Sequence, residues 1–594
     1  MTRKIKKVLV ANRGEIAIRL FRACKELDID SVAIYSDIDN DALHLTYADE
    51  AFRVGEGPPA ESYLNIPNIL EAAKKSGADA VHPGYGFLAE NSEFAKAVED
   101  AGLIWIGPPP QAVFSMGDKV SARKTAAEAG VPSVPGSLEP ISSADAIGAF
   151  ASEHGWPVAL KAAHGGGGRG FRVVRSEEES EQAFEGAARE AGAAFGNPEL
   201  YLERYLETPR HIEVQVIGDL HGNMIHLGER DCSLQRRHQK LIEESPSPVV
   251  DSSLREEMGA AAIKVAKAAG YHSAGTVEFL HENTEAGPRF WFLEMNTRLQ
   301  VEHPVTELVA GLDLAKMMIL VADGEPLPLA QEDVSLRGHS IECRINAENP
   351  AKKFMPAPGT ITSYREPSGP GVRVDSGCTS GSVIPQAYDS LIAKLVCYGT
   401  DRDEAIVRTR RALEEFVIEG VKTTIPFHRL VMGSEWFAKG EFHTKTVETD
   451  LDLSDLPAPS SRVEIAAAAS EGARVDRVFA VEVGGKRLDV RLTEKMDPAT
   501  GRAKPKPPDP AAASKGSGSG EDIVAPMQGT IIKTLVKAGD RVKPGDAIAV
   551  LEAMKMENLI QCRRGGVVKE VKVEAGNQID TGTLIASITP DEEA

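Results

Sequence analysis

The sequence has few cysteines, and none of them belongs to a paired motif. Six cysteines are scattered over 594 residues, and no two of them form a Cys-x-x-Cys pair. Such spacing gives no sign of a disulfide framework and is typical of reduced cytosolic thiols. The cysteines therefore indicate a protein of a reducing compartment.

Long apolar runs and an excess of positive charge are also missing. No stretch approaches the ~18 consecutive apolar residues of a membrane-spanning helix, and the apolar run at residues 8–11 is too short for a signal-peptide core. The formal net charge of −21 argues against a nucleic-acid or acidic-membrane partner, because phosphates need a basic surface. At roughly 150 residues per domain, the length indicates about four domains of a cytoplasmic enzyme.

The C-terminal segment contains an internal repeat. Apolar and polar residues alternate around glycine turns, and the pattern recurs after 37 residues. The recurring glycines are Gly529, Gly539 and Gly545, then Gly566, Gly576 and Gly582. Each half is too small to bury an apolar face alone, so the two should pack as a quasi-symmetric β-sandwich.

One lysine lies in the connection between the two halves, where a tight hairpin would expose its amine. It is Lys555, in Met554-Lys555-Met556, and a lone sequence of this kind would indicate an ordinary surface lysine. Within the repeat, and with Ala525-Pro526-Met527 upstream, the segment instead resembles biotinyl carrier domains. The resemblance implies that Lys555 carries biotin through an amide. Lipoyl domains share the fold, but their lysine is not usually flanked by two methionines.

Apolar strands alternate with helices near the N-terminus. Strands are expected at residues 7–11, 31–35 and 78–82, with a helix over 16–26. This alternation predicts a parallel α/β unit over residues 1–118.

The rest of the chain is divided by composition into five parts. A smaller unit with a glycine-rich loop is followed by a unit of hairpins with a long helix near 402–416, then by a small β-containing module of unclear role. A stretch rich in Pro, Ala, Gly and Ser without apolar periodicity predicts a linker before the repeat. The expected ranges are 119–206, 207–450, 451–497, 498–520 and 521–594.

A run of glycines follows the end of a predicted strand. Lys161 precedes Gly165, Gly166, Gly167 and Gly168. Consecutive glycines let backbone N–H groups surround phosphate oxygens, although a flexible surface turn would show the same residues. The spacing to Lys161, and the earlier Lys119, favour a nucleotide lid. The sequence has no Gly-x-x-x-x-Gly-Lys-Ser/Thr motif, so the loop is not of the Walker type.

Two predicted strands, at residues 274–280 and 289–295, pair around a turn near residue 286. This register places Glu278 opposite Glu294. Facing Cβ atoms lie about 5 Å apart, where like charges are unfavourable. A divalent cation would stabilise the pair, and oxygen ligands suit Mg²⁺ or Mn²⁺. A solvent-exposed strand face is the alternative.

From the second carboxylate onward, polar residues occupy every second position. They are Glu294, Asn296, Arg298, Gln300 and Glu302. If the backbone stays extended, one face carries two carboxylates, two amides and a guanidinium. Such a row could hold a metal at one end, an anion in the middle and a base at the far end.

Several motifs in this order resemble biotin carboxylase of the ATP-grasp superfamily. Besides the glycine-rich loop, they are Asn12-Arg13-Gly14-Glu15, His82-Pro83-Gly84-Tyr85-Gly86, the stretch 230–240, and 294–302. The resemblance covers residues 1–450, and the biotinyl match covers 521–590. Together they are similar to the α subunit of actinobacterial acyl-CoA carboxylases of the acetyl/propionyl-CoA type. The implied fold is a multidomain α/β + β chain: a pre-ATP-grasp α/β domain, an ATP-grasp domain with a lid, a C-terminal α+β domain, a small linker module, and an all-β hammerhead (lipoyl-like) domain.

The resemblance implies a role for each matching residue. Lys119, Lys161 and the loop Gly165–Gly168 would hold the ATP phosphates. The segment from Glu203 to Leu206 would form the hinge beside adenine. The nucleotide pocket would be lined by His211 and His238. Mg²⁺ or Mn²⁺ would be bound by Glu278 and Glu294, with Asn296 adjacent.

The implied reaction begins with bicarbonate attacking the γ-phosphate of ATP, which gives carboxyphosphate and ADP. Glu302 matches the base that removes the bicarbonate proton. Lys240 and Arg298, with the backbone of Gln300 and Val301, match the anion clamp. The residue that stabilises the developing ureido oxyanion of biotin is matched by Arg344.

Three further residues receive weaker assignments. Cys232 lies near the site, but no covalent enzyme intermediate is required, so we interpret it as structural. Arg19 and Asp389 resemble positions at the dimer interface of the family.

The expected function is ATP- and bicarbonate-dependent carboxylation of the chain's own biotin, for delivery to a carboxyltransferase β subunit whose substrate is acetyl-CoA or propionyl-CoA. None of the unassigned segments is long enough to supply that transferase. Further expected partners are a biotin protein ligase and other copies of the chain within an α/β hetero-oligomer. One alternative delivers the carboxyl group to pyruvate. Another is a non-catalytic carrier or scaffold with a decayed ATP site, although the motif residues named above are all present.

Overall fold

The computed structural model describes most of the chain, in two units, Met1–Leu456 and Pro457–Ala594. The described residues are 4–137, 139–162, 172–195, 198–284, 287–454, 456, 474–483, 486–495, 521–526, 528–553, 556–562, 564–580 and 582–590. No helix within these ranges combines the length and the hydrophobicity that a membrane-spanning helix needs.

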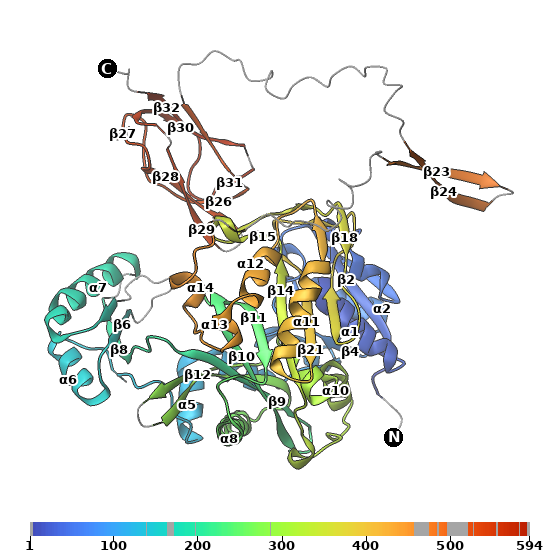
Figure 1. Cartoon of the computed structure of the whole chain (residues 1–594), viewed down its shortest axis with the longest axis horizontal. Helices are drawn as coiled ribbons and strands as arrows, with labels where there is room; N and C mark the ends of the chain where they lie inside the picture. The colour runs from blue at the N-terminus through green and yellow to red at the C-terminus, as the bar shows by residue number, and fades with distance from the viewer. Residues whose placement is uncertain are drawn as a thin grey trace. The chain divides into compact units, whose positions relative to one another are not determined.

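The first unit begins with a five-stranded parallel sheet in the order β3-β2-β1-β4-β5. Alternate residues of the central strand are buried against different clusters on the two faces, which explains its continuous apolar sequence. The predicted strands and first helix are confirmed (Figure 1). The elements are β1 (Lys7–Val10), α1 (Gly14–Glu26), β2 (Asp30–Ser36), β3 (Glu50–Gly55), α2 (Ile66–Ser76), β4 (Ala80–His82), α3 (Ser92–Asp100) and β5 (Ile104–Trp105).

A smaller α/β segment follows and has an apolar cluster of its own. Three antiparallel strands in the order β7-β6-β8 pack against two helices at one end of the unit in Figure 1. The elements are α4 (Pro110–Gly117), α5 (Lys119–Glu128), α6 (Asp145–His154), β6 (Val158–Ala162), β7 (Arg172–Val174), α7 (Ser180–Phe195) and β8 (Leu200–Arg204). The predicted glycine-rich phosphate loop, Gly165–Gly168, lies outside the described residues.

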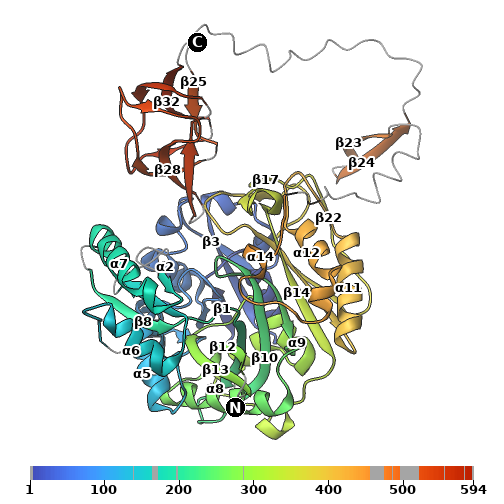
Figure 2. The ribbon, with the colours of Figure 1, turned by 60° about the vertical axis from the view of Figure 1, so that its left-hand side comes forward.

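The centre of the first unit is an eight-stranded antiparallel sheet, in the order β13-β12-β9-β10-β11-β14-β21-β19 (Figure 2). Its strands are β9 (Arg210–Gly218), β10 (Met224–Arg236), β11 (Gln239–Ser245), β12 (Ser273–Thr284), β13 (Gly287–Asn296), β14 (His339–Asn346), β19 (Val372–Ser376) and β21 (Leu391–Gly399). The helices packed against it are α8 (Ser252–Ala268), α9 (His303–Ala310), α10 (Leu314–Ala322) and α11 (Arg402–Glu415). The last of these confirms the long helix predicted near 402–416.

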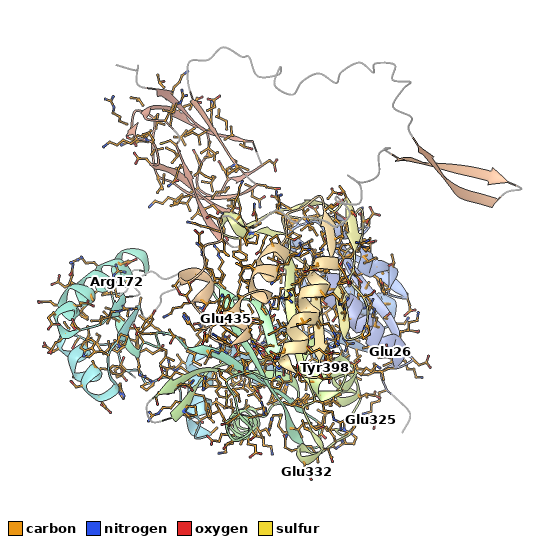
Figure 3. The ribbon with its side chains drawn as sticks, viewed as in Figure 1. Glu26, Arg172, Glu325, Glu332, Tyr398 and Glu435 are labelled. Carbon is orange, nitrogen blue, oxygen red and sulfur yellow. The ribbon has the colours of Figure 1, made fainter. Side chains whose placement is uncertain are left out.

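Short elements complete the unit. They are β15 (Glu348–Asn349), β16 (Met355–Pro356), β17 (Gly359–Thr360), β18 (Ser363–Arg365), β20 (Val383–Ile384), β22 (Val417–Glu419), α12 (Ile425–Met432), α13 (Glu435–Ala438) and α14 (Thr446–Thr449). Ion pairs link helices distant in sequence: Glu26, labelled in Figure 3 at the end of α1, pairs with Lys316 of α10. Leu451, Leu453 and Leu456 pack on the apolar cluster beneath α11 and α12, so the first unit extends to residue 456.

The second unit contains a hairpin of β23 (Arg474–Val483) and β24 (Lys486–Lys495), followed by a β-sandwich. The sandwich has two four-stranded sheets, β25-β32-β30-β27 and β29-β28-β26-β31. Apolar residues from both halves of the sequence repeat form one buried cluster, which confirms the predicted sandwich. The strands are β25 (Glu521–Val524), β26 (Gly529–Thr534), β27 (Arg541–Val542), β28 (Ala547–Ala553), β29 (Met556–Gln561), β30 (Gly566–Val571), β31 (Gln578–Ile579) and β32 (Leu584–Pro590).

The strands on either side of the predicted biotinyl lysine pair with each other. Antiparallel pairing of β28 with β29 reaches Ala553 opposite Met556. Lys555 itself lies outside the described residues.

Candidate active site

Three adjacent strands bring three carboxylates side by side. Glu278 of β12 lies opposite Glu294 of β13, as predicted, and opposite Glu213 of β9 on its other side. A register shift follows directly after the first of these pairs. Because like charges at facing positions repel, this row requires nearby cations.

Lys240, on β11, supplies one such cation. Its ammonium group donates hydrogen bonds to Glu278 Oε1 at 2.7 Å and to Glu302 Oε1 at 2.8 Å, and it also bonds Glu213. Burial alone would lower the pKa of this lysine, but the three carboxylates hold its pKa well above the ordinary value. Lys240 is therefore a fixed positive charge at the centre of the cluster.

Arg344 of β14 bonds the other carboxylate oxygen of Glu302, the candidate base. Its Nη2 donates to Glu302 Oε2 at 2.8 Å, and its Nε donates to Glu243 Oε1 at 2.6 Å. Burial would raise the pKa of Glu302, but Lys240, Arg344 and Arg230 hold that pKa well below its usual value. Glu302 is thus an ionised carboxylate, the form that can accept a proton.

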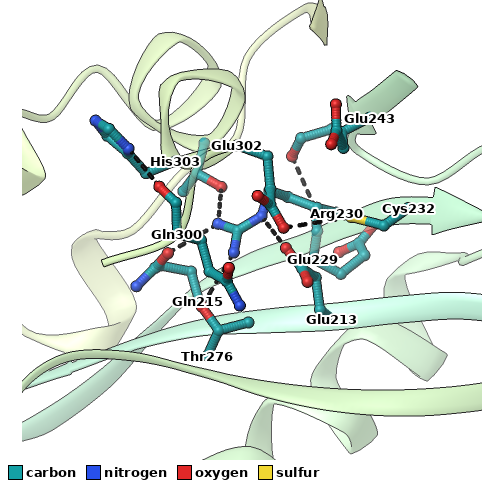
Figure 4. Close-up of polar contacts among 12 residues, drawn as sticks. Glu213, Gln215, Glu229, Arg230, Cys232, Glu243, Thr276, Gln300, Glu302 and His303 are labelled. Atoms are coloured by element: carbon teal, nitrogen blue, oxygen red, sulfur yellow. Dashed lines mark hydrogen bonds and ion pairs between the residues drawn. The ribbon is translucent and has the colours of Figure 1, made fainter. Parts of the chain in front are cut away.

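Arg230 fixes Glu213, one of the fully buried carboxylates of the cluster (Figure 4). This fully buried guanidinium donates to Glu213, to Gln215 Oε1 at 2.8 Å and to Thr276 Oγ1 at 3.0 Å. A buried charge of this kind is stable only when its donors are satisfied by geometry as close as this. Arg230 therefore holds Glu213 in place, and Glu213 in turn holds Lys240.

The prediction assumed an extended backbone from Glu294 to Glu302. This assumption is wrong, because these residues do not lie on one strand. β13 ends at Asn296, and Glu302 is the N-terminal capping residue of α9. The turn between them nevertheless returns Glu302 toward Lys240. Within it Arg298 donates to Gln300 Oε1 at 2.8 Å and to Glu90 Oε2 at 2.9 Å. The predicted residues converge because the chain reverses.

The metal-binding prediction rests on two carboxylates that the fold brings together, Glu278 and Glu294. Asn296 lies beside them, but its Oδ1 accepts a hydrogen bond from Arg298 Nη2 at 3.1 Å, and its amide N–H₂ is a donor that does not bind a cation. Burial and the charge of Glu278 raise the pKa of Glu294, which is the sign of a carboxylate without enough positive charge nearby. A hard divalent cation such as Mg²⁺ matches oxygen donors of this type. His211 Nε2 lies 3.0 Å from Glu278 and neighbours the same position.

The predicted nucleotide residues are distributed around the β6-β8 sheet and the start of α5. Lys161 of β6 forms an ion pair with Glu203 of β8, and Lys119 is the first residue of α5. Leu206 is buried with Val134 and Trp291. His238 instead lies exposed in the turn between β10 and β11, with φ of 64°. The contacts described for this residue do not join it to the carboxylate cluster.

Sequence reasoning missed three carboxylates that organise the site: Glu90, Glu213 and Glu243. One signal was available, because His211, Glu213 and Gln215 alternate with apolar residues along β9. Burial raises the pKa of Glu243 to about 7 against the opposing effect of Arg344.

The Cys232 thiol lies 4.0 Å from Glu302 Oε1, and burial raises the pKa of this thiol well above the ordinary value. A thiol held in its neutral form is a poor nucleophile, in keeping with a structural role.

Four known families match successive parts of the chain. "Biotin carboxylase, N-terminal domain" matches residues 4–113, "Carbamoyl-phosphate synthase L chain, ATP binding domain" 118–330, "Biotin carboxylase C-terminal domain" 342–449, and "Biotin-requiring enzyme" 521–588. The biotin-dependent acyl-coenzyme A carboxylase alpha3 subunit of Mycobacterium leprae is 47% identical over 98% of this chain and 99% of its own length.

Two further relatives match the first unit. A pyruvate carboxylase subunit of Methanothermobacter thermautotrophicus is 55% identical over 74% of this chain and 89% of its own. The biotin carboxylase domain of Hydrogenobacter thermophilus 2-oxoglutarate carboxylase, solved with MgADP, ADP and bicarbonate, is 49% identical, with a TM-score of 0.69 over 77% of this chain and all of that domain. The resemblance predicted from the motifs is confirmed, and so is the fold class. The chain belongs to the family of biotin-dependent acyl-coenzyme A carboxylase alpha subunits, biotin carboxylases that carry a biotinyl domain on the same polypeptide.

Proposed function

We propose that this chain carboxylates biotin attached to its own Lys555 and delivers the carboxyl group to a carboxyltransferase β subunit that acts on acetyl-CoA or propionyl-CoA. The cofactors are covalent biotin, ATP and Mg²⁺, and bicarbonate is the substrate. The observation that carries the proposal is the convergence of Lys240 and Arg344 on one ionised carboxylate, Glu302, in a chain that also contains a biotinyl domain.

Each residue of the cluster has a task in this reaction. Glu302 accepts the proton of bicarbonate, since an ionised carboxylate in hydrogen-bond reach lowers the barrier for a weak nucleophile. Lys240 and Arg298 hold the anion, and the planar guanidinium suits an oxyanion because it offers two parallel hydrogen bonds. Arg344 stabilises negative charge that develops on the ureido oxygen.

The nucleotide is held at the other end of the carboxylate row. Lys119, Lys161 and Gly165–Gly168 bind its phosphates, and Glu203 to Leu206, with His211 and His238, surround the rest of the nucleotide. Glu278 and Glu294, with Asn296 beside them, hold Mg²⁺, which when bound neutralises phosphate charge and supplies electrophilic activation at the γ-phosphate. Since Lys240 contacts both Glu278 and Glu302, it connects the metal end of the site to the base.

The acceptor is tested by mixing the purified full-length chain with the β subunit that co-purifies from its native host. We expect label from ¹⁴C-bicarbonate to appear in acid-stable products with acetyl-CoA or propionyl-CoA. No label should appear with pyruvate. The competing proposal, a pyruvate-specific transferase, is favoured by the relative that is a pyruvate carboxylase subunit; labelling of pyruvate alone would establish it. A non-catalytic scaffold would show no bicarbonate-dependent ATP hydrolysis with free biotin.

Residues 451–497 are proposed as the part of the chain that docks the β subunit. Because Leu451 and Leu453 pack on the first unit, the sharper deletion removes only the β23–β24 hairpin, residues 474–495. We expect this deletion to abolish co-purification with β and to spare carboxylation of free biotin. A deletion of equal length in the linker, residues 498–519, is the control and should keep the complex. Unchanged co-purification after hairpin removal rejects the docking role.

Two further partners are proposed. A biotin protein ligase attaches biotin to Lys555, and copies of the chain assemble within an α/β hetero-oligomer. Of the two residues expected at a dimer interface, Asp389 is exposed, whereas Arg19 is buried in ion pairs with Glu307 and Asp313 of its own chain. A direct contact with a second copy therefore fits Asp389 better than Arg19.

A further inference from the structure

One lysine of the first unit is fully enclosed and takes no part in the roles assigned above. Lys394 lies on β21, and its side chain has no exposed surface. Its cross-strand neighbours are Arg344 on β14 and Asp375 on β19. Lys394 is therefore the residue beside Arg344 in the same row of the sheet.

The ammonium group of Lys394 reaches the turn that precedes α9. It donates a hydrogen bond to the Val301 carbonyl at 3.0 Å. It also lies 3.1 Å from Glu15 Oε1 and 3.8 Å from Asp375 Oδ2. Residues from helix α1, the central sheet and the turn beside Glu302 thus meet at a single nitrogen atom.

The surroundings keep this lysine charged. Burial lowers its pKa, but Glu15, Asp375 and Glu342 more than compensate, so the pKa of Lys394 is raised. Glu15 is held in turn by the hydroxyl of Tyr85. A buried ammonium group without such partners would be strongly destabilising. The arrangement therefore presents a fixed, charged donor to one backbone carbonyl.

That carbonyl belongs to the peptide unit that carries Glu302. Because the peptide bond is planar, holding the Val301 oxygen also sets the direction of the Glu302 N–H and the position of its Cα. The preceding carbonyl, Gln300 O, is bonded by His303 Nδ1 at 2.6 Å. The carbonyls of Gln300 and Val301 are consequently both fixed by side chains from outside the turn.

We propose that Lys394 is a positioning residue of the bicarbonate site. By holding the Val301 carbonyl it keeps the backbone at Gln300–Val301 and the Glu302 carboxylate directed at the same bound anion. This inference rests on the proposed role of Glu302 and the anion clamp. It predicts a change in the KM for bicarbonate rather than in the KM for ATP.

The test is the Lys394→Met variant of the full-length chain, assayed by bicarbonate-dependent ATP hydrolysis with free biotin. Losing a hydrogen bond from a charged donor should raise the KM for bicarbonate about tenfold or more and lower kcat, with the KM for ATP changed less than about twofold. Methionine leaves the Glu15 carboxylate without its cation. The double variant Lys394→Met/Glu15→Gln also removes the charge of Glu15, and its KM values should change in the same way as those of the single variant. Glu15→Gln alone, which keeps the lysine, should raise the KM for bicarbonate by a smaller factor.

A second lysine provides a matched control. Lys445 also donates to backbone carbonyls, those of Leu206 at 3.2 Å and Glu207 at 2.6 Å, beside the proposed adenine hinge. Lys445→Met should therefore raise the KM for ATP and leave that for bicarbonate unchanged. If the folded Lys394 variants keep the wild-type KM for bicarbonate, or raise both KM values equally, the positioning role is overturned while wild-type activity still supports the proposed function. Absence of bicarbonate-dependent hydrolysis in the wild type would overturn both.

Discussion

Replacing Lys555 with alanine should end carboxyl transfer to the acceptor while leaving carboxylation of free biotin at the wild-type rate. The first unit contains the whole carboxylate cluster, so it does not need the carrier to turn over a free substrate. Transfer to a separate subunit does need biotin anchored to the chain. Incorporation of ¹⁴C-bicarbonate into acyl-CoA and into free biotin, measured on the same preparation, separates the two steps.

Two controls make this result specific to the position. Lys555→Arg keeps the positive charge but cannot form the amide, so it should behave as alanine does. Lys533→Arg changes an exposed lysine on β26 of the same sandwich and should retain both biotin and transfer. Transfer at the normal rate by Lys555→Ala would contradict the carrier assignment, as would an unmodified lysine in protein made in its native host.

The features that were predictable from sequence depend on local periodicity. Ile531 and Val568 occupy equivalent places in the two repeats, and both are buried in one cluster of the sandwich. A period of two residues contains the information about which face each of these side chains occupies. The prediction that Glu278 faces Glu294 is correct for a reason that the period does not contain: the register next to the turn, with Thr284 opposite Gly287, would place Glu278 opposite Leu293, and a register shift between Glu278 and Phe279 brings Glu294 into that place.

The features that were not predictable depend on where strands end and on contacts across long stretches of chain. Alternating polarity continues past Asn296 although the strand does not, because the convergent side chains follow a turn and a helix start. Glu90 meets Arg298 across 208 residues, and Arg344 meets Glu243 across 101. No periodic pattern encodes such pairs. The second follows from the pairing of β11 with β14, and the first from the contact of the turn before α3 with the turn after β13.

The second large effect is expected from Glu302→Gln, which should reduce carboxylation of free biotin by about 10²- to 10⁴-fold, the usual contribution of a general base. Glutamine has nearly the same shape but cannot take a proton at neutral pH. Lys240 retains Glu213 and Glu278 as partners, and Arg344 retains Glu243, so the cations do not become unpaired. Affinity for ATP, measured by nucleotide titration, should stay within about twofold of the wild type, since no residue assigned to the nucleotide is altered.

Glu244→Gln is the matched control. Glu244 is a buried carboxylate next to Glu243 in the sequence, and its partners are His339 and Arg402. The folded fraction of this variant should carboxylate free biotin at the wild-type rate. A Glu302→Gln variant within about tenfold of the wild type would require another base. Among the described neighbours, Glu213 is tied to Arg230, a guanidinium with no exposed surface, whereas Lys240 and Arg344, the two cations that bond Glu302, are partly exposed and are the residues assigned to the anion and to biotin. Cys232 holds its proton because burial raises the pKa of its thiol. The rate of the Glu302→Gln variant therefore decides whether Glu302 is the base.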